Sequence, residues 1–290
     1  MIFKSKKLTP EFYESLLPYV EEGKSIPCII HQTYVSKDLP QELKQNVEYL
    51  KKTNPGWTHH LYDDQDILKF IHENYGTVLL DYYRRINPKY GAARADLFRY
   101  LLVYKYGGVY IDIKSSCNSP LNKVLLPYDK YILTHWRNNE GEIHAQIGKF
   151  KELEHIEQGE YQQWYIIAVA GHPFLRSVIK NVLTNIDKYR PWTFGTGGIG
   201  VLRLSGPIAY TLAIHPVLHS APYRLLENES LIDFQYSIYS TAKHHRSIYK
   251  VHYFFLTESI VKMSFIYNVL GSIYSFLKKN KNIIKKRINI

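Results

Sequence analysis

The most constraining feature of this sequence is the alternation of short apolar segments and longer helical patterns between positions 26 and 112. Residues 26–34 and 58–62 have the apolar or β-type pattern of strands, whereas residues 41–52 repeat apolar side chains at helical spacing. Such alternation is typical of an α/β fold, in which a mostly parallel sheet is flanked by helices. In such sheets ligands bind beyond the carboxyl ends of the strands.

The segment YGGVYIDIK, positions 106–114, indicates where this sheet would carry chemistry. Apolar residues at helical spacing fill positions 91–106, two glycines end that helix, and positions 109–112 have the β-branched and aromatic pattern of a strand. The strand ends on Asp112 and so carries a carboxylate to the rim of the sheet. Two residues later, where a second acid would complete a pair, stands Lys114.

Size and composition agree with one large α/β unit. The chain has 290 residues, 45% of them hydrophobic, and neither a linker nor a repeat divides it. We predict a single α/β domain over residues 1–262, followed by an amphipathic and basic α-helical segment over 263–290 that is not an independent domain. The two cysteines exclude a disulfide framework and a zinc site made mainly of thiolates.

Much of the net charge of +11 lies in the last stretch, residues 277–290. One interpretation is docking on an anionic membrane surface. The other is a packed terminal helix that ends in a solvated basic tail. Because no recognition motif accompanies the charge, nucleic acid is not expected as a partner.

Asp96 and Arg99 are three residues apart on the helix that leads into the strand ending at Asp112, so they are neighbours on its surface. A guanidinium between two carboxylates can bind sugar hydroxyls and phosphate oxygens. The alternative is an exposed ion pair worth about 0.3–0.5 kcal/mol. Spacing alone favours the exposed ion pair.

The stretch RADLFRYLLVYKYGGVYID resembles the sugar-binding signature of glycosyltransferase family 32. IPCIIHQTY and NPGWTHHLYDD resemble the first two strands of that family and precede the signature in the right order. The resemblance implies a GT-A-type fold. It also implies transfer of a hexose from a UDP- or GDP-linked nucleotide sugar to a hydroxyl of a glycan or glycolipid, with retention at the anomeric carbon.

The resemblance also implies roles for individual residues. Asp96 and Arg99 would hold the donor sugar, and Asp112 would be the first acid of a DxD motif, facing the ribose or a metal on the diphosphate. Tyr34 stands where the family has a tryptophan and would stack on the base. His31 and Gln32, on the same strand, are candidates for donor binding, and packing at the strand end explains them equally well.

Lys114 departs from the family pattern, since the second acid of a DxD motif is normally a ligand of Mn²⁺ or Mg²⁺. Three outcomes are open. The protein could bind metal through Asp112 and His252, which resembles a late histidine of the family; Lys114 could itself supply the positive charge; or the chain could be inactive. The first is favoured because Asp112 is retained. A non-catalytic glycan- or membrane-binding protein with the same fold is the alternative function.

Several other polar segments have less specific patterns. Arg94 is a further candidate for leaving-group stabilisation, whereas Asp63 or Asp64 is better explained as a helix cap. GTGGIG, residues 195–200, lacks the lysine and hydroxyl of a phosphate-binding loop and is predicted to be a flexible loop on the acceptor side. Residues 144–163 are polar without periodicity and are predicted to form a mobile loop over the site.

The first twenty residues contain several charges and no uninterrupted apolar core of the secretory type. We therefore expect a cytoplasmic protein, with peripheral attachment to the inner face of a membrane as an option. A bacterial or viral origin is expected rather than residence in the Golgi.

Overall fold

The computed structural model describes residues 8–239, 253–263, 267, 269–271, 273 and 274. Within them lie a six-stranded sheet and a two-stranded sheet. The strands are β1 (Ile29–Thr33), β2 (Thr58–Tyr62), β3 (Gly108–Ile111), β4 (Ser116–Cys117), β5 (Tyr131–His135), β6 (Tyr165–Ala168), β7 (Arg224–Asn228) and β8 (Phe234–Gln235). The larger sheet has the order β2-β1-β3-β6-β5-β7, and β4 pairs with β8.

The larger sheet is mixed but mostly parallel. β1 is parallel to β2 and β3, and β5 is parallel to β7, whereas β6 is antiparallel to both of its neighbours. The carboxyl ends of β1, β2, β3, β5 and β7 therefore meet at one edge, together with the start of β6. We call this the carboxyl-end edge. The predicted mostly parallel sheet is confirmed, and only the direction of β6 differs from it.

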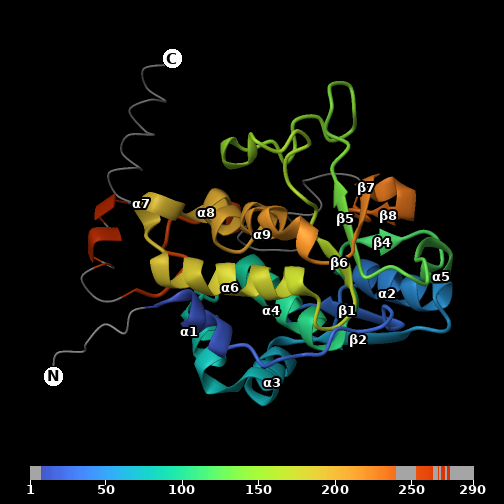
Figure 1. Ribbon diagram of the computed structural model, residues 1–290, viewed down its shortest axis with the longest axis horizontal. Helices are drawn as coiled ribbons and strands as arrows, with labels where there is room; N and C mark the ends of the chain where they lie inside the picture. The colour runs from blue at the N-terminus through green and yellow to red at the C-terminus, as the bar shows by residue number, and fades with distance from the viewer. Residues whose placement is uncertain (1–7, 240–252, 264–266, 268, 272, 275–290) are drawn as a thin grey trace.

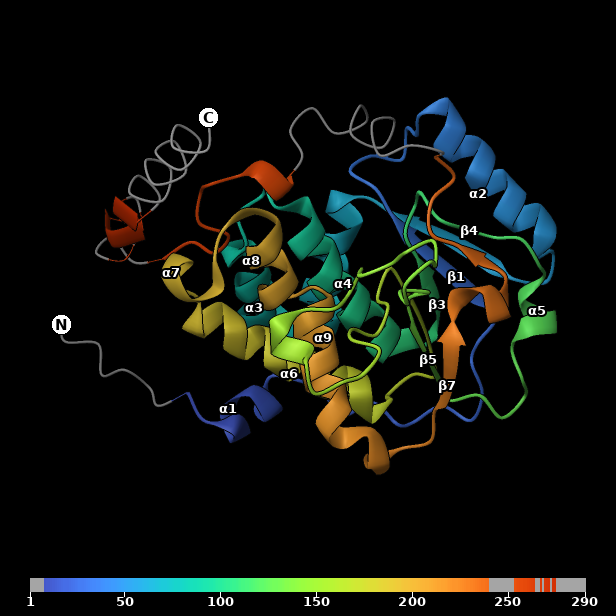
Figure 2. The same cartoon turned by 90° about the horizontal axis from the view of Figure 1, so that it is seen from above.

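Helices cover both faces of the sheet (Figures 1 and 2). The labelled α-helices are α1 (Pro10–Ser15), α2 (Gln41–Thr53), α3 (Asp64–Arg85), α4 (Gly91–Tyr106), α5 (Leu121–Val124), α6 (Pro173–Lys188), α7 (Pro191–Phe194), α8 (Gly197–Leu204) and α9 (Pro207–Ile214). Short 3₁₀ turns are η1 (Lys151–Leu153), η2 (His215–Ser220), η3 (Glu229–Ile232) and η4 (Tyr253–Phe255).

Alternating side chains divide the core between the two faces. Tyr110 of β3 and Ile166 of β6 pack in the cluster that contains α3, α4 and α6. Val109 and Ile111, their neighbours on β3, pack on the other face with side chains of α2 and α5. Because side chains alternate with a period of two residues, a residue just after β3 points to the same face as the residue two positions before it.

The long helical stretch after β2 begins where the sequence indicated. The Asp63 side chain accepts hydrogen bonds from the backbone N–H groups of Gln65 and Asp66. The Asp66 side chain in turn accepts a hydrogen bond from the Asp63 backbone N–H, and the two together form a capping box. α3 continues to Arg85 through a kink at Gly76, which has φ 76°.

The glycine-rich stretch 195–200 is not a flexible acceptor-side loop, so that prediction is wrong. Gly197, Gly198 and Gly200 are buried in the first turn of α8. A Cβ at Gly198 would lie 2.0 Å from the ring of Phe254, and one at Gly200 would lie 2.7 Å from the carbonyl oxygen of Gly195. The glycines are therefore required for close packing.

By length and composition, Gly197–Ser220 is long and apolar enough to cross a membrane, and 72% of its most apolar 18-residue stretch is buried inside the protein. The stretch is divided into α8, α9 and η2, and its apolar side chains, such as Leu204 and Ile214, belong to the core. Packing in the core accounts for this composition.

The chain beyond η4 returns to the core before it leaves the described region. Ile260 and Val261 are buried, and Val261 forms an isolated bridge with Ile86. The described residues 267, 269–271, 273 and 274 are helical, as expected for the C-terminal extension. The basic residues of 275–290 lie outside the described residues, and the proposed division at residue 262 stays a prediction.

Candidate active site

A tight connection between α4 and β3 brings the two elements of the predicted site together. Gly107 and Gly108 have φ of 69° and 98°. A Cβ at Gly107 would lie 2.6 Å from the Ala170 backbone nitrogen, and one at Gly108 would lie 2.7 Å from the Ile29 carbonyl oxygen. Only glycine fits both the conformation and the space, which explains the pair of glycines before the strand.

Arg99 and Asp112 meet across this connection. Asp112 continues the face of Tyr110, which α4 covers, and the Arg99 guanidinium lies 4.6 Å from the centre of the Tyr110 ring. Arg99 Nη2 is 3.0 Å from Asp112 Oδ1. The Asp112 backbone N–H also donates to the Trp164 carbonyl at the start of β6. The predicted convergence of helix and strand end is thus present.

Asp96 is buried beside Arg99, so the interpretation as an exposed ion pair is wrong. Their side chains are 4% and 5% exposed, with Arg99 Nη2 at 3.5 Å from Asp96 Oδ1. The other Asp96 oxygen accepts a hydrogen bond from the Ser205 hydroxyl at 2.9 Å. Burial raises the pKa of Asp96, opposed by Arg99 and by the hydrogen bonds from Ser205 and Gln163.

Gln163 completes this cluster and was missed from the sequence. Its carbonyl and side-chain oxygens accept hydrogen bonds from Arg99 Nη1 at 2.7 and 3.1 Å, and its amide donates to Asp96 Oδ1 at 3.2 Å. Burial lowers the pKa of Arg99, but Asp112 leads the groups that raise it, and the net shift is upward. Gln163 ends the polar segment 144–163, so that segment reaches the cluster, and its mobility stays a prediction.

Lys114 lies on an aromatic face. Its Nζ is 4.0 Å from the centre of the Tyr236 ring, and that ring packs edge-to-face with Trp136 and Trp164. Ile113 between the two motif positions is buried in the core, whereas Asp112 and Lys114 are partly exposed. Asp112 and Lys114 therefore flank one buried residue at the carboxyl-end edge.

The turn that carries Lys114 is held by hydrogen bonds with several other segments of the chain. Asn46 donates to the carbonyls of residues 113 and 115, Gln32 to the carbonyl of residue 112, and the residue 238 backbone N–H to that of residue 114. The Ser115 hydroxyl donates to the Tyr236 carbonyl at 2.6 Å. The segment bearing Tyr236 is thereby tied to the motif turn.

Tyr253 is a second residue that the sequence analysis missed, although it adjoins the candidate His252. Burial raises its pKa, and the charges of Asp96, Tyr236 and Asp112 add to the shift. The Tyr253 side chain also packs against the core group that contains side chains of α4. His252 itself, the predicted metal ligand, lies outside the described residues.

His31 and Gln32 make contacts that hold strands together. His31 Nε2 is 3.0 Å from the Gly107 carbonyl, and its Nδ1 is 3.2 Å from the Tyr62 hydroxyl. Burial lowers the pKa of His31 to about 4, so the ring is neutral at pH 7. The Gln32 amide donates to the Asp112 carbonyl, and its oxygen is 2.9 Å from His59 Nε2. These contacts support the packing interpretation.

Tyr34 and Arg94, two further candidates from the sequence, make different contacts. Tyr34 is half-buried just beyond β1, against the small core group that contains Ile113, and burial raises its pKa. It remains a candidate for stacking on a base. Arg94 donates through Nε and Nη2 to the Ile86 carbonyl and lies over the Tyr83 ring, so its guanidinium is engaged with the helices.

The described residues do not form a divalent metal site. Among them there is no group of three or more His, Cys, Asp or Glu side chains able to hold a metal ion. Asp112 Oδ1 is already paired with Arg99, and the second motif position carries an ammonium group. Hard divalent cations need oxygen ligands, so this donor set does not fit Mn²⁺ or Mg²⁺.

Residues 40–131, which contain α4, β3 and the Asp112 turn, match the family described as "Glycosyltransferase sugar-binding region containing DXD motif". Regions of this type typically use a divalent metal ion. The resemblance to glycosyltransferase family 32 is confirmed.

Two similar proteins come from yeasts. "Inositol phosphoceramide mannosyltransferase 3" of Schizosaccharomyces pombe is 28% identical over 164 residues, which are 57% of this chain and 39% of that protein. "Mannosyl phosphorylinositol ceramide synthase SUR1" of Saccharomyces cerevisiae is 38% identical over 34% of this chain and 25% of that protein. The chain thus spans well under half the length of these two curated relatives. A solved structure, "PaToxG Glycosyltransferase", is similar with a TM-score of 0.45 and 17% identity, covering 73% of this chain and 75% of that one.

The predicted localisation is wrong. Relatives matched over more than half of the chain include mannosyltransferases and a mannosyl phosphorylinositol ceramide synthase of fission and budding yeast, which are eukaryotic proteins. A viral glycosyltransferase matches over only 34% of the chain. The prediction relied on charged residues near position 1, and these do not determine the compartment.

Proposed function

We propose that this chain is a glycosyltransferase that moves a hexosyl group from a UDP- or GDP-linked sugar to a hydroxyl of a glycan or glycolipid, with retention at the anomeric carbon. The observation that carries the proposal is the Asp96–Arg99–Asp112 cluster at the carboxyl-end edge, within a stretch that matches a sugar-binding region. The matched relatives are named for mannose transfer and for inositol phosphoceramide. Mannose and a phosphoinositol lipid are therefore the first donor sugar and acceptor to test.

The exposure of the three side chains divides their tasks. The Asp112 side chain is 23% exposed, whereas those of Arg99 and Asp96 are 5% and 4% exposed. Asp112 is therefore the carboxylate that touches a donor, accepting hydrogen bonds from its hydroxyls. Arg99 is a positioning residue that holds Asp112 and is itself held by Asp96 and Gln163.

The reaction breaks the bond between the anomeric carbon and the diphosphate oxygen, and the bonding electrons leave with the diphosphate. A bond from the acceptor oxygen forms on the same face of the sugar, and the hydroxyl proton passes to the departing diphosphate. Fixed positive charge near that leaving oxygen lowers the barrier. No covalent nucleophile is assigned.

The test is a screen of UDP- and GDP-linked hexoses, mannose first, that measures released nucleoside diphosphate with and without Mn²⁺. We expect one donor to be turned over. Asp112→Asn should lower kcat/KM about 100-fold or more, whereas Asp81→Asn on the exposed surface of α3 should not change it. Release from no donor under either condition would refute the proposal, and retained glycan binding in that case would favour the non-catalytic alternative. A membrane surface as partner stays a prediction.

A further inference from the structure

The second position of the DxD motif is the largest chemical departure in the candidate site. An acid there would carry one negative charge, and Lys114 carries one positive charge. The difference is two charge units, which equals the charge of one Mn²⁺ or Mg²⁺ ion. The substitution therefore supplies at this position the charge that the acid would have recruited from solution.

We propose that Lys114 takes the place of the divalent cation, so that this chain binds and activates the donor diphosphate without a metal ion. The inference rests on the proposed function. The Lys114 ammonium contacts the non-bridging oxygens of the diphosphate through its N–H donors. As the bond to the anomeric carbon breaks, it stabilises the negative charge that collects on the leaving oxygen.

The position of the ammonium group is built into the fold. Its Nζ lies 4.0 Å from the centre of the Tyr236 ring, an arrangement that attracts a cation without neutralising its charge. Trp136 and Trp164 pack edge-to-face with the Tyr236 ring. A lysine without such a partner would sample many rotamers, whereas this ammonium group lies over the partly exposed Tyr236 ring, and its residue is two positions from Asp112.

The backbone on both sides of this contact is equally constrained. The Ser115 hydroxyl is bonded to the Tyr236 carbonyl, and Asn46 is bonded to the carbonyls of residues 113 and 115. The motif turn and the aromatic ring therefore keep their relative positions. Such preorganised charge is what a site must have to stabilise a leaving group.

The neighbouring charges disfavour a metal ion at the same place. Arg99 Nη2 is 3.0 Å from Asp112 Oδ1, so the one motif carboxylate is already paired. A divalent cation on the other oxygen of Asp112 would join a site that already holds the Arg99 guanidinium and, two residues along the chain, the Lys114 ammonium. Both positive charges oppose the binding of a further cation.

The test measures binding of UDP and of GDP to the full chain by calorimetry, in EDTA and in Mn²⁺, together with Mn²⁺ binding by electron paramagnetic resonance. We expect the wild-type chain to bind one of the two nucleotides in EDTA, with a Kd that Mn²⁺ changes less than about threefold. Lys114→Asp should weaken nucleotide binding in EDTA about 100-fold, and Mn²⁺ should restore that binding. The variant should also show the resonance signal of bound Mn²⁺.

Further variants separate charge from shape and from folding. Lys114→Met keeps the length of the side chain and should lose binding in EDTA without recovery in Mn²⁺. Tyr236→Leu should weaken binding about three- to thirtyfold, and Tyr236→Phe, which keeps the ring face, should not. Lys123→Ala, which removes an exposed lysine of α5, controls for a general loss of positive charge. Circular dichroism establishes that each variant is folded.

Two results would contradict the inference in different ways. Wild-type binding that requires Mn²⁺, with a stoichiometric Mn²⁺ signal, would overturn metal independence and leave the proposed function standing. Binding of neither nucleotide under either condition would overturn the proposed function, and the inference with it.

Discussion

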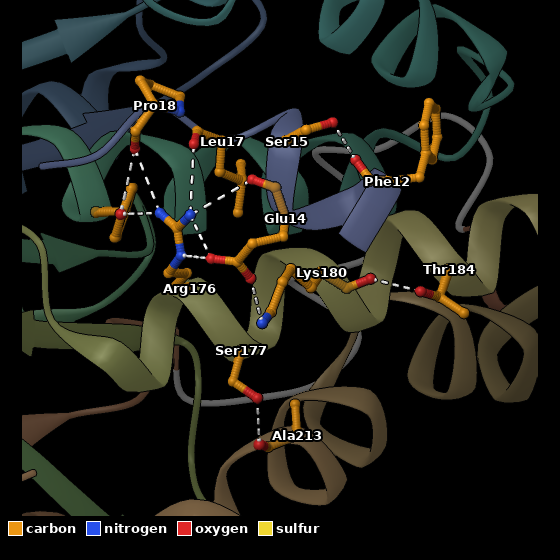
Figure 3. Close-up of polar contacts among 11 residues, drawn as sticks. Phe12, Glu14, Ser15, Leu17, Pro18, Arg176, Ser177, Lys180, Thr184 and Ala213 are labelled. Atoms are coloured by element: carbon orange, nitrogen blue, oxygen red, sulfur yellow. Dashed lines mark hydrogen bonds and ion pairs between the residues drawn. The ribbon is translucent and has the colours of Figure 1, made fainter. Parts of the chain in front are cut away.

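Two clusters of three charged side chains differ in construction. In the junction cluster, Glu14 of α1 is held between Arg176 and Lys180 of α6 (Figure 3). In the site cluster, Arg99 lies between the carboxylates of Asp96 and Asp112. One is an anion between two cations, and the other is a cation between two anions.

Burial separates the two clusters more than their charges do. Glu14 and Lys180 are 44% and 37% exposed, and water screens their pairing. Arg99 and Asp96 are 5% and 4% exposed, so each depends on protein groups to replace water. The junction cluster joins two helices at small cost. The site cluster buries charge at considerable cost, which is expected where charge serves binding.

The largest expected effect comes from breaking the site cluster at its centre. Arg99→Met would leave the buried Asp96 carboxylate without its cation, and we expect the free energy of unfolding to fall by about 3–5 kcal/mol at pH 7. Urea denaturation measures the change. Arg84→Met, at an exposed pair with Asp81, is the control and should stay within about 0.5 kcal/mol. A loss below about 1 kcal/mol for Arg99→Met would show that burial does not distinguish the clusters.

Glu160 is another buried carboxylate near the carboxyl-end edge, and its burial predicts a pH dependence of stability. Burial raises the pKa of Glu160 to about 7, against a hydrogen bond from Trp136 that lowers it. Its Oε2 has no hydrogen-bond partner among the described residues. Because the folded-state pKa lies above the usual 4.5, the stability contributed by the protonated form is complete below pH 4.5 and is lost as pH rises through 7.

Glu160→Gln should therefore gain stability relative to wild type as pH rises. The difference should open between pH 4.5 and 7 and reach up to about 3 kcal/mol at pH 8. Urea denaturation at pH 4.5, 6 and 8 measures it. Burial lowers the pKa values of His31 and His172 to about 4. Their protonation on acidification destabilises both proteins equally, so it cancels from the difference. Parallel stability curves would contradict the prediction.

The smallest effect is expected at the junction cluster. Glu14→Gln removes an exposed negative charge from between two cations and should cost about 0.5–1 kcal/mol, less at high salt. Urea denaturation at two salt concentrations measures it. Binding of UDP or GDP should not change. A loss as large as that of Arg99→Met would mean that α1 depends on Glu14 far more than its exposure suggests.

The sequence predicted the elements of the fold because their signals are local. The spacing of apolar residues located α2 and α4, and Asp63 indicated the start of α3. Strand direction is not encoded in this way, which explains why the antiparallel β6 was not foreseen. The glycines of α8 were misinterpreted because the side chain of Phe254, far along the chain, determines the need for them.

The site was predicted in part for the same reason. Arg99 and Asp112 belong to one continuous helix-to-strand segment, and their meeting follows from the pattern of that segment. The burial of Asp96 depends on Ser205 and Gln163, which come from distant segments. Tyr236 beneath Lys114 likewise comes from another segment. Tertiary contacts of this kind leave no periodic signal in a single sequence.

The two-glycine connection between α4 and β3 has a consequence for insertions and deletions. Because successive strand residues face opposite sides of the sheet, one extra residue before β3 would rotate every following side chain to the other face. Ile111 would then stand where Asp112 meets the guanidinium, and the carboxylate would be directed toward the helices on the far side. The length of this loop is therefore as strict a requirement for the chemistry as the acid itself.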